Sequence, residues 1–238
     1  MKKQWFIAVA ALFIAAGFSI GFILSKQTLP SSSASSQTQT ALFSSPEGQK
    51  LQRAAASASL LETILQTSLE HAVQPGDSLG RIAKQCNTTI DLIKKMNQLD
   101  TDLIRVGEIL KVPNGRFSVL VSKSKNTLDL FLNETTVKSY AVSTGKDNST
   151  PVGEFTIASR LENPVWYKTG AVIPPGSPDN ILGTRWLGFS LKGYGIHGTV
   201  EPDKIGQAVT AGCIRMRNED VEELYAFIPV GSSARVQD

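Results

Sequence analysis

The sequence has very few cysteine and histidine side chains. Its 238 residues include 2 cysteines and 2 histidines, which excludes a disulfide-stapled scaffold and a cysteine-rich zinc module. Any cysteine or histidine chemistry must use four residues: His71, Cys86, His197 and Cys213. Their spacing matches no zinc knuckle or ribbon, so we predict neither a metal site nor a cofactor.

The sequence also has no concentration of positive charge. The net charge is +3, and residues 115–238 carry 13 basic and 13 acidic side chains. A nucleic-acid partner would require a basic surface, so we predict none. With 41% hydrophobic residues the chain can form a folded core, which excludes a disordered or collagen-like protein.

An uncharged run of 20 residues, Trp5 to Leu24, follows Lys2 and Lys3. At about 1.5 Å per residue this run spans roughly 30 Å, the hydrocarbon thickness of a bilayer. The lysines favour a cytoplasmic N-terminus. A cleaved signal peptide is the alternative, although no Ala-x-Ala site follows closely. We predict a single-pass transmembrane anchor at residues 1–24 in the inner (cytoplasmic) membrane, with the remainder on the periplasmic, extracytoplasmic side.

Residues 25–70 are predicted to form a serine-rich linker followed by a spacer helix. Seven serines lie between Ser31 and Pro46, where large apolar residues are too few to form a core. From Gln49 to Glu70, apolar residues recur at helical spacing. We interpret this helix as a plain amphipathic spacer.

Residues 71–114 show the order strand, helix, helix, strand. Turn residues precede a first helix at Ser78, Thr89 begins a second helix, and Gly107 introduces the closing strand. This order resembles the LysM domain, and the resemblance rests on the following residues: Gly76-Asp77-Ser78-Leu79, Ile82-Ala83, Asn97, Ile104, Gly107, Leu110 and Val112-Pro113.

The LysM resemblance implies a small α+β domain of βααβ order that binds glycans containing N-acetylglucosamine, most often peptidoglycan. It implies a sugar groove between two loops, built from Gly76, Asp77, Ser78, Leu79, Leu103 and Ile104. His71 and Cys86 stand at or near positions where the family often has aromatic residues. We interpret them as a strand-start residue and a small buried hydrophobic residue, rather than as a metal or catalytic pair.

From residue 116 to 238 the pattern changes to short alternating segments punctuated by glycine and proline, which predicts a mainly-β, β-sandwich-like domain. One helix is predicted from Asn218 to Phe227, with Asn218 as its cap. Arg235-Val236 can form a last strand or a frayed end.

Two motifs of this domain carry the candidate chemistry: Gly195-Ile196-His197-Gly198-Thr199 and Thr210-Ala211-Gly212-Cys213-Ile214-Arg215-Met216. A cysteine nucleophile needs a group that takes its proton, and His197 is the only histidine of the domain. A tight Gly212-Cys213 turn exposes the sulfur and can present backbone N–H groups to an oxyanion. The Gly198 carbonyl can accept the second imidazole N–H and fix the tautomer.

These motifs resemble the L,D-transpeptidase catalytic domain of the YkuD type, which has His-Gly and then, after a gap, Ser/Thr-x-Gly-Cys-apolar-Arg. His197 and Cys213 are 16 positions apart, and Thr210 takes the Ser/Thr position. Some members carry His where this chain has Ala211. Further landmarks of the resemblance are Ser143-Thr144-Gly145-Lys146, Ser149-Thr150-Pro151-x-Gly153-x-Phe155 and Asn180-Ile181-Leu182-Gly183-Thr184-Arg185-Trp186.

The second resemblance implies a cysteine acyltransferase of peptidoglycan biosynthesis, cell-wall organisation and cell shape. It implies that Cys213 attacks the stem-peptide bond before D-Ala, that His197 carries the proton, and that a thioester then accepts the amine of a second stem. The product is a 3-3 cross-link. The resemblance also implies that carbapenems acylate Cys213. Gly198 and Gly212 would act through their backbone groups.

Several alternatives remain open at this point. Thr210, Arg215, Tyr194 and Trp186 are candidate substrate-binding residues, but Arg215 can instead form a salt bridge beneath the site, and the aromatic rings can be core or cleft wall. Water in place of the amine would give an L,D-carboxypeptidase-like hydrolase. An inactive relative would be a non-catalytic peptidoglycan-binding scaffold. A Cys86–Cys213 disulfide is disfavoured because the two residues lie in separate predicted domains.

Overall fold

The computed structural model describes residues 45–238. The predicted anchor at residues 1–24 and the linker up to residue 44 lie outside the described residues. Between residues 45 and 238, no helix is both long and apolar enough to cross a membrane. The chain divides into two units, Met1–Gly48 and Gln49–Asp238, and the second contains both predicted domains.

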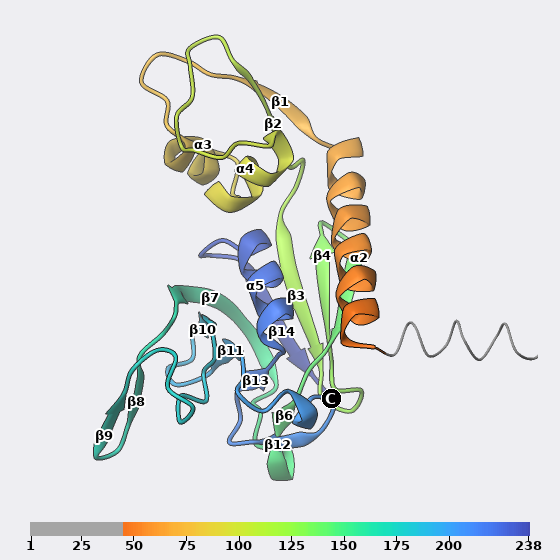
Figure 1. The fold of residues 1–238 in the computed structure, drawn as a ribbon, viewed down its shortest axis with the longest axis vertical. Helices are drawn as coiled ribbons and strands as arrows, with labels where there is room; N and C mark the ends of the chain where they lie inside the picture. Colours follow the sequence, from red (N-terminus) through yellow and green to blue (C-terminus); the bar gives the residue numbers. More distant parts are fainter. Residues whose placement is uncertain (1–44) are drawn as a thin grey trace, which may run out of the picture. The chain divides into compact units, whose positions relative to one another are not determined.

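The smaller domain has the order predicted for it: β1 (Leu69–Ala72), α3 (Leu79–Gln85), α4 (Ile90–Asn97) and β2 (Ile109–Val112) (Figure 1). The side chains of Ser78 and Thr89 begin the two helices, since each accepts a hydrogen bond from a backbone N–H three residues later. The antiparallel strands and the helices enclose an apolar core: Val73, Leu79, Ile82, Ala83, Ile93, Leu110 and Val112. The βααβ prediction is confirmed.

Helix α2 (Pro46–Gln66) ends earlier than the sequence pattern predicts. The predicted helix continues to Glu70, but the Ser68 hydroxyl donates a hydrogen bond to the carbonyl of Leu65 at 2.7 Å. Such local bonds compete with the helical ladder and favour its termination. Strand β1 then begins at Leu69, two residues before the predicted domain boundary.

The interpretation of α2 as a plain spacer is wrong. Leu60 and Ile64, one helical turn apart, are 4% and 0% exposed and belong to the main core of the catalytic domain. The Ser57 hydroxyl also donates a hydrogen bond to Glu223 of α5 (Asn218–Phe227) at 2.5 Å. Helix α2 is therefore an integral part of the folded unit.

Replacing Ile64 by alanine is expected to lower the free energy of unfolding by about 2–5 kcal/mol, because it leaves a cavity in a closed core. Leu51→Ala on the same helix is the matched control, since Leu51 is 68% exposed and should change stability by no more than about 0.5 kcal/mol. Urea unfolding of the full chain measures both values. Equal effects of the two substitutions would contradict the packing of α2.

Eight strands of the larger domain form one curled sheet in the order β13-β11-β10-β7-β14-β3-β4-β5 (Figure 1). The strands are β3 (Phe117–Ser122), β4 (Thr127–Leu132), β5 (Thr135–Ala141), β7 (Gly153–Glu162), β10 (Arg185–Phe189), β11 (Gly195–His197), β13 (Ile214–Arg215) and β14 (Ser233–Gln237). The prediction of a mainly-β domain is confirmed, and the strands form one continuous curled sheet.

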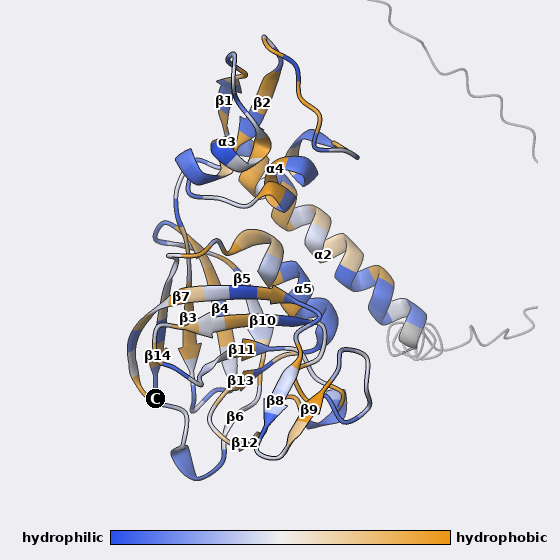
Figure 2. Ribbon diagram, turned by 90° about the vertical axis from the view of Figure 1, so that its left-hand side faces the viewer, coloured by the Kyte–Doolittle hydropathy of each residue, from blue (hydrophilic) through white to orange (hydrophobic). Residues whose placement is uncertain are grey.

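Two small ladders complete the larger domain. Strand β6 (Thr144–Gly145) pairs with β12 (Ala208–Thr210), and β8 (Trp166–Lys168) forms a hairpin with β9 (Ala171–Ile173). The hairpin carries apolar residues, most visibly along β9 (Figure 2). Single 3-10 turns lie at Lys146–Asn148 and Pro202–Lys204.

The C-terminal segment is a central strand and not a frayed end. Strand β14 lies between β3 and β7, parallel to the first and antiparallel to the second. Ala234 and Val236 are 0% and 1% exposed. The last residues of the chain therefore complete the sheet.

The two domains share buried side chains. Leu92 and Met96 of α4 belong to the main core, and the Thr89 hydroxyl donates a hydrogen bond to the carbonyl of Ala226 at the end of α5. Deleting the small domain would therefore expose part of the catalytic core.

Candidate active site

Two strands bring the two motifs together. Strands β11 and β13 run parallel, with His197 opposite Arg215, and the N–H of Met216 donates a hydrogen bond to the carbonyl of His197 at 2.8 Å. Cys213 immediately precedes β13. The 16-residue spacing in sequence thus becomes adjacency at one edge of the sheet.

A cleft of about 570 Å³ opens over these residues. Five of the residues predicted for the site line it: Trp186, His197, Thr210, Cys213 and Arg215. Its apolar walls come from the end of β7, the β8–β9 hairpin and the segment before β10: Leu161, Pro164, Val165, Trp166, Tyr167, Ile181 and Leu182.

A larger depression of about 910 Å³ lies between α2, α4 and α5. Its lining is dominated by charged side chains and includes neither cysteine nor histidine. We therefore take the smaller cleft as the candidate active site, because it contains a possible nucleophile and a possible base.

His197 is 3% exposed, and its Nδ1 lies 2.7 Å from the carbonyl oxygen of Gly198. A carbonyl can only accept, so Nδ1 carries the proton and Nε2 has the lone pair. Burial lowers the pKa of His197 to about 4; Arg215 also lowers it, while the Gly198 and Ile181 carbonyls oppose the shift. The ring is therefore neutral at pH 7. Trp186 stacks on it, with ring centroids 6.1 Å apart.

The Cys213 thiol is partly buried and donates a hydrogen bond to the carbonyl of Gly193 at 3.5 Å. Burial raises the pKa of this thiol, and the Gly195 N–H acts in the opposite direction. The sulfur is therefore protonated at rest. No hydrogen bond joins the thiol to the His197 ring in the part of the chain that the structure describes.

Gly212 is required by the shape of the turn before Cys213. Its φ is +129°, and a Cβ at this position would lie 2.8 Å from the Tyr194 ring and 3.0 Å from the carbonyl oxygen of Ser149. The Gly212 N–H donates a hydrogen bond to the Thr210 hydroxyl at 3.1 Å, and that hydroxyl donates to the carbonyl of Cys213 at 2.6 Å.

This geometry changes the expectation that Gly212 supplies an oxyanion donor. Its N–H is already bonded within the turn, so it is not free for a substrate. The N–H of Cys213 makes no hydrogen bond to any residue between 45 and 238. Thr210, expected to bind substrate, lines the cleft but uses its hydroxyl to brace the turn.

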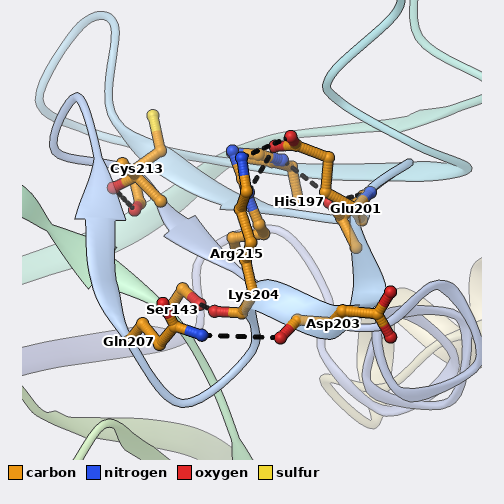
Figure 3. A network of polar contacts seen from close by, with 11 residues as sticks. Ser143, His197, Glu201, Asp203, Lys204, Gln207, Cys213 and Arg215 are labelled. Carbon is orange, nitrogen blue, oxygen red and sulfur yellow. Dashed lines mark hydrogen bonds and ion pairs between the residues drawn. The ribbon is translucent and has the colours of Figure 1, made fainter. Parts of the chain in front are cut away.

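Arg215 forms the salt bridge that was one of its two interpretations (Figure 3). Its Nη1 lies 2.9 Å from Oε2 of Glu201, and Glu201 also pairs with Lys204. The Arg215 side chain is 8% exposed, and its Nε is buried without a partner within the described chain. Figure 3 shows His197, Arg215 and Glu201 on one side of Cys213.

Residues 116–236 match the model of the YkuD family, described as the L,D-transpeptidase catalytic domain. The chain belongs to the YkuD family of L,D-transpeptidases. Residues 71–113 match the LysM domain. The family makes the protein an acyltransferase that acts on peptidoglycan, and the two domains together support peptidoglycan binding and a location in the cell envelope.

Curated relatives carry the same family name. Putative L,D-transpeptidase YqjB of Bacillus subtilis is 44% identical over 126 residues, which cover 50% of this chain and 70% of that protein. Putative L,D-transpeptidase YkuD of Bacillus licheniformis is 35% identical over 176 residues, 71% of this chain and 98% of that protein. An L,D-transpeptidase structure from Mycobacterium tuberculosis aligns with a TM-score of 0.43 at 20% identity, covering 56% of this chain and 63% of that one.

The two aromatic residues predicted to bind substrate in this L,D-transpeptidase lie in different surroundings. Trp186 lines the cleft. Tyr194 packs against the main core and over Gly212, and it is not part of the cleft wall. Its position favours the core alternative.

The residues predicted to bind glycan do not form one exposed set. Leu79 is 2% exposed and is a core residue, so it cannot contact a sugar. Asp77 accepts hydrogen bonds from the Gln74 N–H and pairs with His71, each at 2.9 Å. Ser78 caps α3. Gly76 takes φ +84° in the turn, Ile104 packs against the core, and Leu103 is 85% exposed.

The second cysteine lies in the small domain, away from the cleft. Both cysteines are free thiols, and Cys86 packs against the small core, where burial raises its pKa. No cluster of potential metal ligands is present among residues 45–238.

Two asparagines that brace the site, one buried and one half-buried, were missed as functional residues. Asn180 is 1% exposed, and its amide donates to the carbonyls of Pro164 and Pro174, which flank the β8–β9 hairpin. Asn218, predicted to cap α5, makes no cap hydrogen bond and instead contacts Thr199. Asn180 stood in a recognised landmark, but its partners are distant in sequence.

Proposed function

We propose that this L,D-transpeptidase forms 3-3 cross-links between stem peptides through a thioester on Cys213. The observation that carries the proposal is that a thiol and a buried neutral imidazole line one apolar cleft in a chain of this family. Because the His197 ring and the Cys213 thiol are both neutral at rest, the reaction does not start from a thiolate–imidazolium ion pair. Proton transfer accompanies attack when a bound substrate brings the groups within reach.

In the first half-reaction, the Cys213 sulfur attacks the carbonyl carbon between the third, diamino residue and D-Ala of a tetrapeptide stem. The thiol proton passes to Nε2 of His197 and then to the nitrogen of D-Ala as the C–N bond breaks. D-Ala leaves, and the acyl group remains on sulfur as a thioester. The Cys213 N–H, which is free within the described chain, is a candidate donor to the oxyanion.

In the second half-reaction, the side-chain amine of a second stem attacks the thioester. His197 takes a proton from this amine and returns it to the sulfur as the C–S bond breaks. The new amide is the cross-link. Arg215 lines the cleft, so its guanidinium is a candidate contact for a substrate carboxylate.

We propose that residues 71–114 dock on glycan strands and that residues 116–238 perform catalysis. The exposed Leu103 and the turn at Gly76 are the available surface of the expected sugar groove. We retain the anchor at residues 1–24 as a proposal that rests on its uncharged run.

The products of a disaccharide-tetrapeptide incubated with the full chain test the proposal. Mass spectrometry should detect a cross-linked dimer and free D-Ala. Free tripeptide as the main product would establish the L,D-carboxypeptidase-like hydrolase instead. If the chain binds peptidoglycan but produces neither product, the non-catalytic scaffold is the remaining interpretation.

The acid limb of the kcat/KM profile is expected near pH 4, well below the ordinary histidine value of about 6.5, because the base must be neutral and burial lowers the pKa of His197 to about 4. Initial rates between pH 3.5 and pH 8 measure it. An acid limb above pH 6 would mean that the ring is solvated.

Folding must be monitored in the same pH series. The pKa of His197 is lower in the folded chain than in the unfolded chain, so the unfolded chain takes up a proton first as pH falls. The stabilising contribution is complete above about pH 6.5 and is lost progressively towards pH 4. Tryptophan fluorescence at each pH separates unfolding from titration of the active site.

A further inference from the structure

The side chain of Asn218 connects the two catalytic motifs. Its Oδ1 accepts hydrogen bonds from the N–H of Thr199 at 3.0 Å and of Thr184 at 3.3 Å. Its Nδ2 donates to the carbonyl of Thr199 at 2.9 Å. Asn218 follows Cys213 by five positions, and Thr199 follows His197 by two. One amide therefore joins the segments that carry the nucleophile and the base.

The bond to the Thr199 N–H acts on the partner of His197. That N–H and the Gly198 carbonyl belong to the same peptide group, and the carbonyl oxygen lies 2.7 Å from Nδ1 of His197. Because a peptide group is planar, fixing the N–H direction also fixes the C=O direction. A hydrogen bond at the N–H also polarises the group and makes its carbonyl a stronger acceptor.

Two glycines provide the space that this amide occupies. A Cβ at Gly183 or at Gly198 would lie 2.2 Å from Oδ1 of Asn218. Any side chain at either position would displace the amide. Gly198 therefore has two roles: its carbonyl accepts a hydrogen bond from His197, and its lack of a side chain leaves space for the Asn218 amide.

We propose that Asn218 is a positioning residue for proton transfer by His197. Through the Gly198–Thr199 peptide group it holds the tautomer with the proton on Nδ1, which leaves the Nε2 lone pair for the thiol proton. Asn218 does not line the cleft, so it acts only through other residues. The inference rests on the proposed role of His197 as the proton carrier.

Asn218→Ala in the full chain is expected to lower kcat for a soluble tetrapeptide donor by about 10- to 100-fold, by analogy with the loss of hydrogen-bond partners that orient metal-ligating histidines. KM should change less than twofold, since no cleft contact is lost. Asn218→Asp is the conservative variant because it can still accept both N–H bonds, although it loses the Nδ2 bond to the Thr199 carbonyl; it should recover part of kcat.

The tautomer of His197 distinguishes a positioning role of Asn218 from a purely structural one, because a purely structural role would leave the tautomer unchanged. With two histidines in the chain, selective 15N-histidine labelling gives two ring signal sets, and His71→Gln assigns them. In the unchanged protein the His197 signals should show a protonated Nδ1 and an unprotonated Nε2. Asn218→Ala should show a mixture of tautomers, and Asn218→Asp should restore one.

Asn97→Ala is the matched control. Asn97 contacts Lys111 in the same way, with Oδ1 2.7 Å from its N–H nitrogen and Nδ2 2.8 Å from its carbonyl oxygen, but it belongs to the LysM domain. Its loss should lower stability without changing kcat or the His197 tautomer.

A folded Asn218→Ala protein with kcat within twofold of the unchanged chain and a single Nδ1–H tautomer would overturn the inference. If that variant does not fold, Asn218→Ser is measured in its place, because serine is too short to reach Thr199 and tests the same bonds. Failure of the proposed function has a different signature, since His197→Gln would then remain active. An inactive His197→Gln beside an unimpaired Asn218→Ala would refute only the positioning role.

Discussion

Cys213→Ala is expected to abolish product formation and every covalent adduct, because no acyl-enzyme can form without the sulfur. Alanine is smaller than cysteine at this partly buried position, so the fold should be retained. The family resemblance adds that a carbapenem should leave a stable adduct on the unchanged chain. Intact-protein mass spectrometry reads the adduct directly, and a tetrapeptide assay reads turnover.

The chain supplies its own control for this result. Cys86 is the other free thiol, and it packs in the small core away from the cleft. Cys86→Ala should therefore keep both the adduct and the activity. An adduct that survived Cys213→Ala and disappeared with Cys86→Ala would place the nucleophile in the wrong domain.

His197→Gln is expected to lower kcat by about 100- to 10,000-fold, the contribution of general acid–base catalysis. Without the ring, a thiol with a pKa raised by burial is almost entirely protonated at pH 7, and the departing D-Ala nitrogen has no proton donor. Glutamine keeps a polar side chain of similar length in the buried position, which limits the loss of packing.

The control for this substitution is His71→Gln. His71 pairs with Asp77 in the LysM domain and lies outside the cleft. Turnover of a soluble tetrapeptide, measured as D-Ala release, should stay within twofold. A fall of more than tenfold in the control, or a His197→Gln protein of near-normal rate, would contradict the assignment of the base.

The order of the small domain and the two motifs that meet at the cleft could be read from the sequence because their signals are local patterns. Ser78 and Thr89 begin helices through bonds to backbone three residues later, and such signals are short-range. The motifs that contain His197 and Cys213 are each short and bounded by glycine, which made them recognisable in the sequence. The structure places them at neighbouring strands.

The parts that could not be predicted depend on contacts between distant segments. The alanine-rich helix α2 has only a weak apolar stripe. A stripe of this kind is compatible both with an exposed spacer and with a packed helix. The helix is buried at Leu60 and Ile64 because the core of the larger domain packs against them. The C-terminal strand was ambiguous because its two neighbours come from residues 117–122 and 153–162.

Asn218 shows how a correct local signal can suggest the wrong role. An asparagine at a helix start normally accepts a bond from its own helix. Here the available partner is Thr199, 19 positions earlier, and the closeness of the two glycine backbones decides the geometry. Likewise, the Gly212 N–H looked free in the motif, and only the structure shows its bond to Thr210.

The protonated resting state of Cys213 has a consequence for how long the protein lasts in the envelope. Oxidants and disulfides react with thiolates far faster than with thiols. Because burial raises the pKa of the Cys213 thiol, the free protein offers little thiolate to peroxides. Burial of Cys213 is thus expected to slow its oxidation while the cleft is empty.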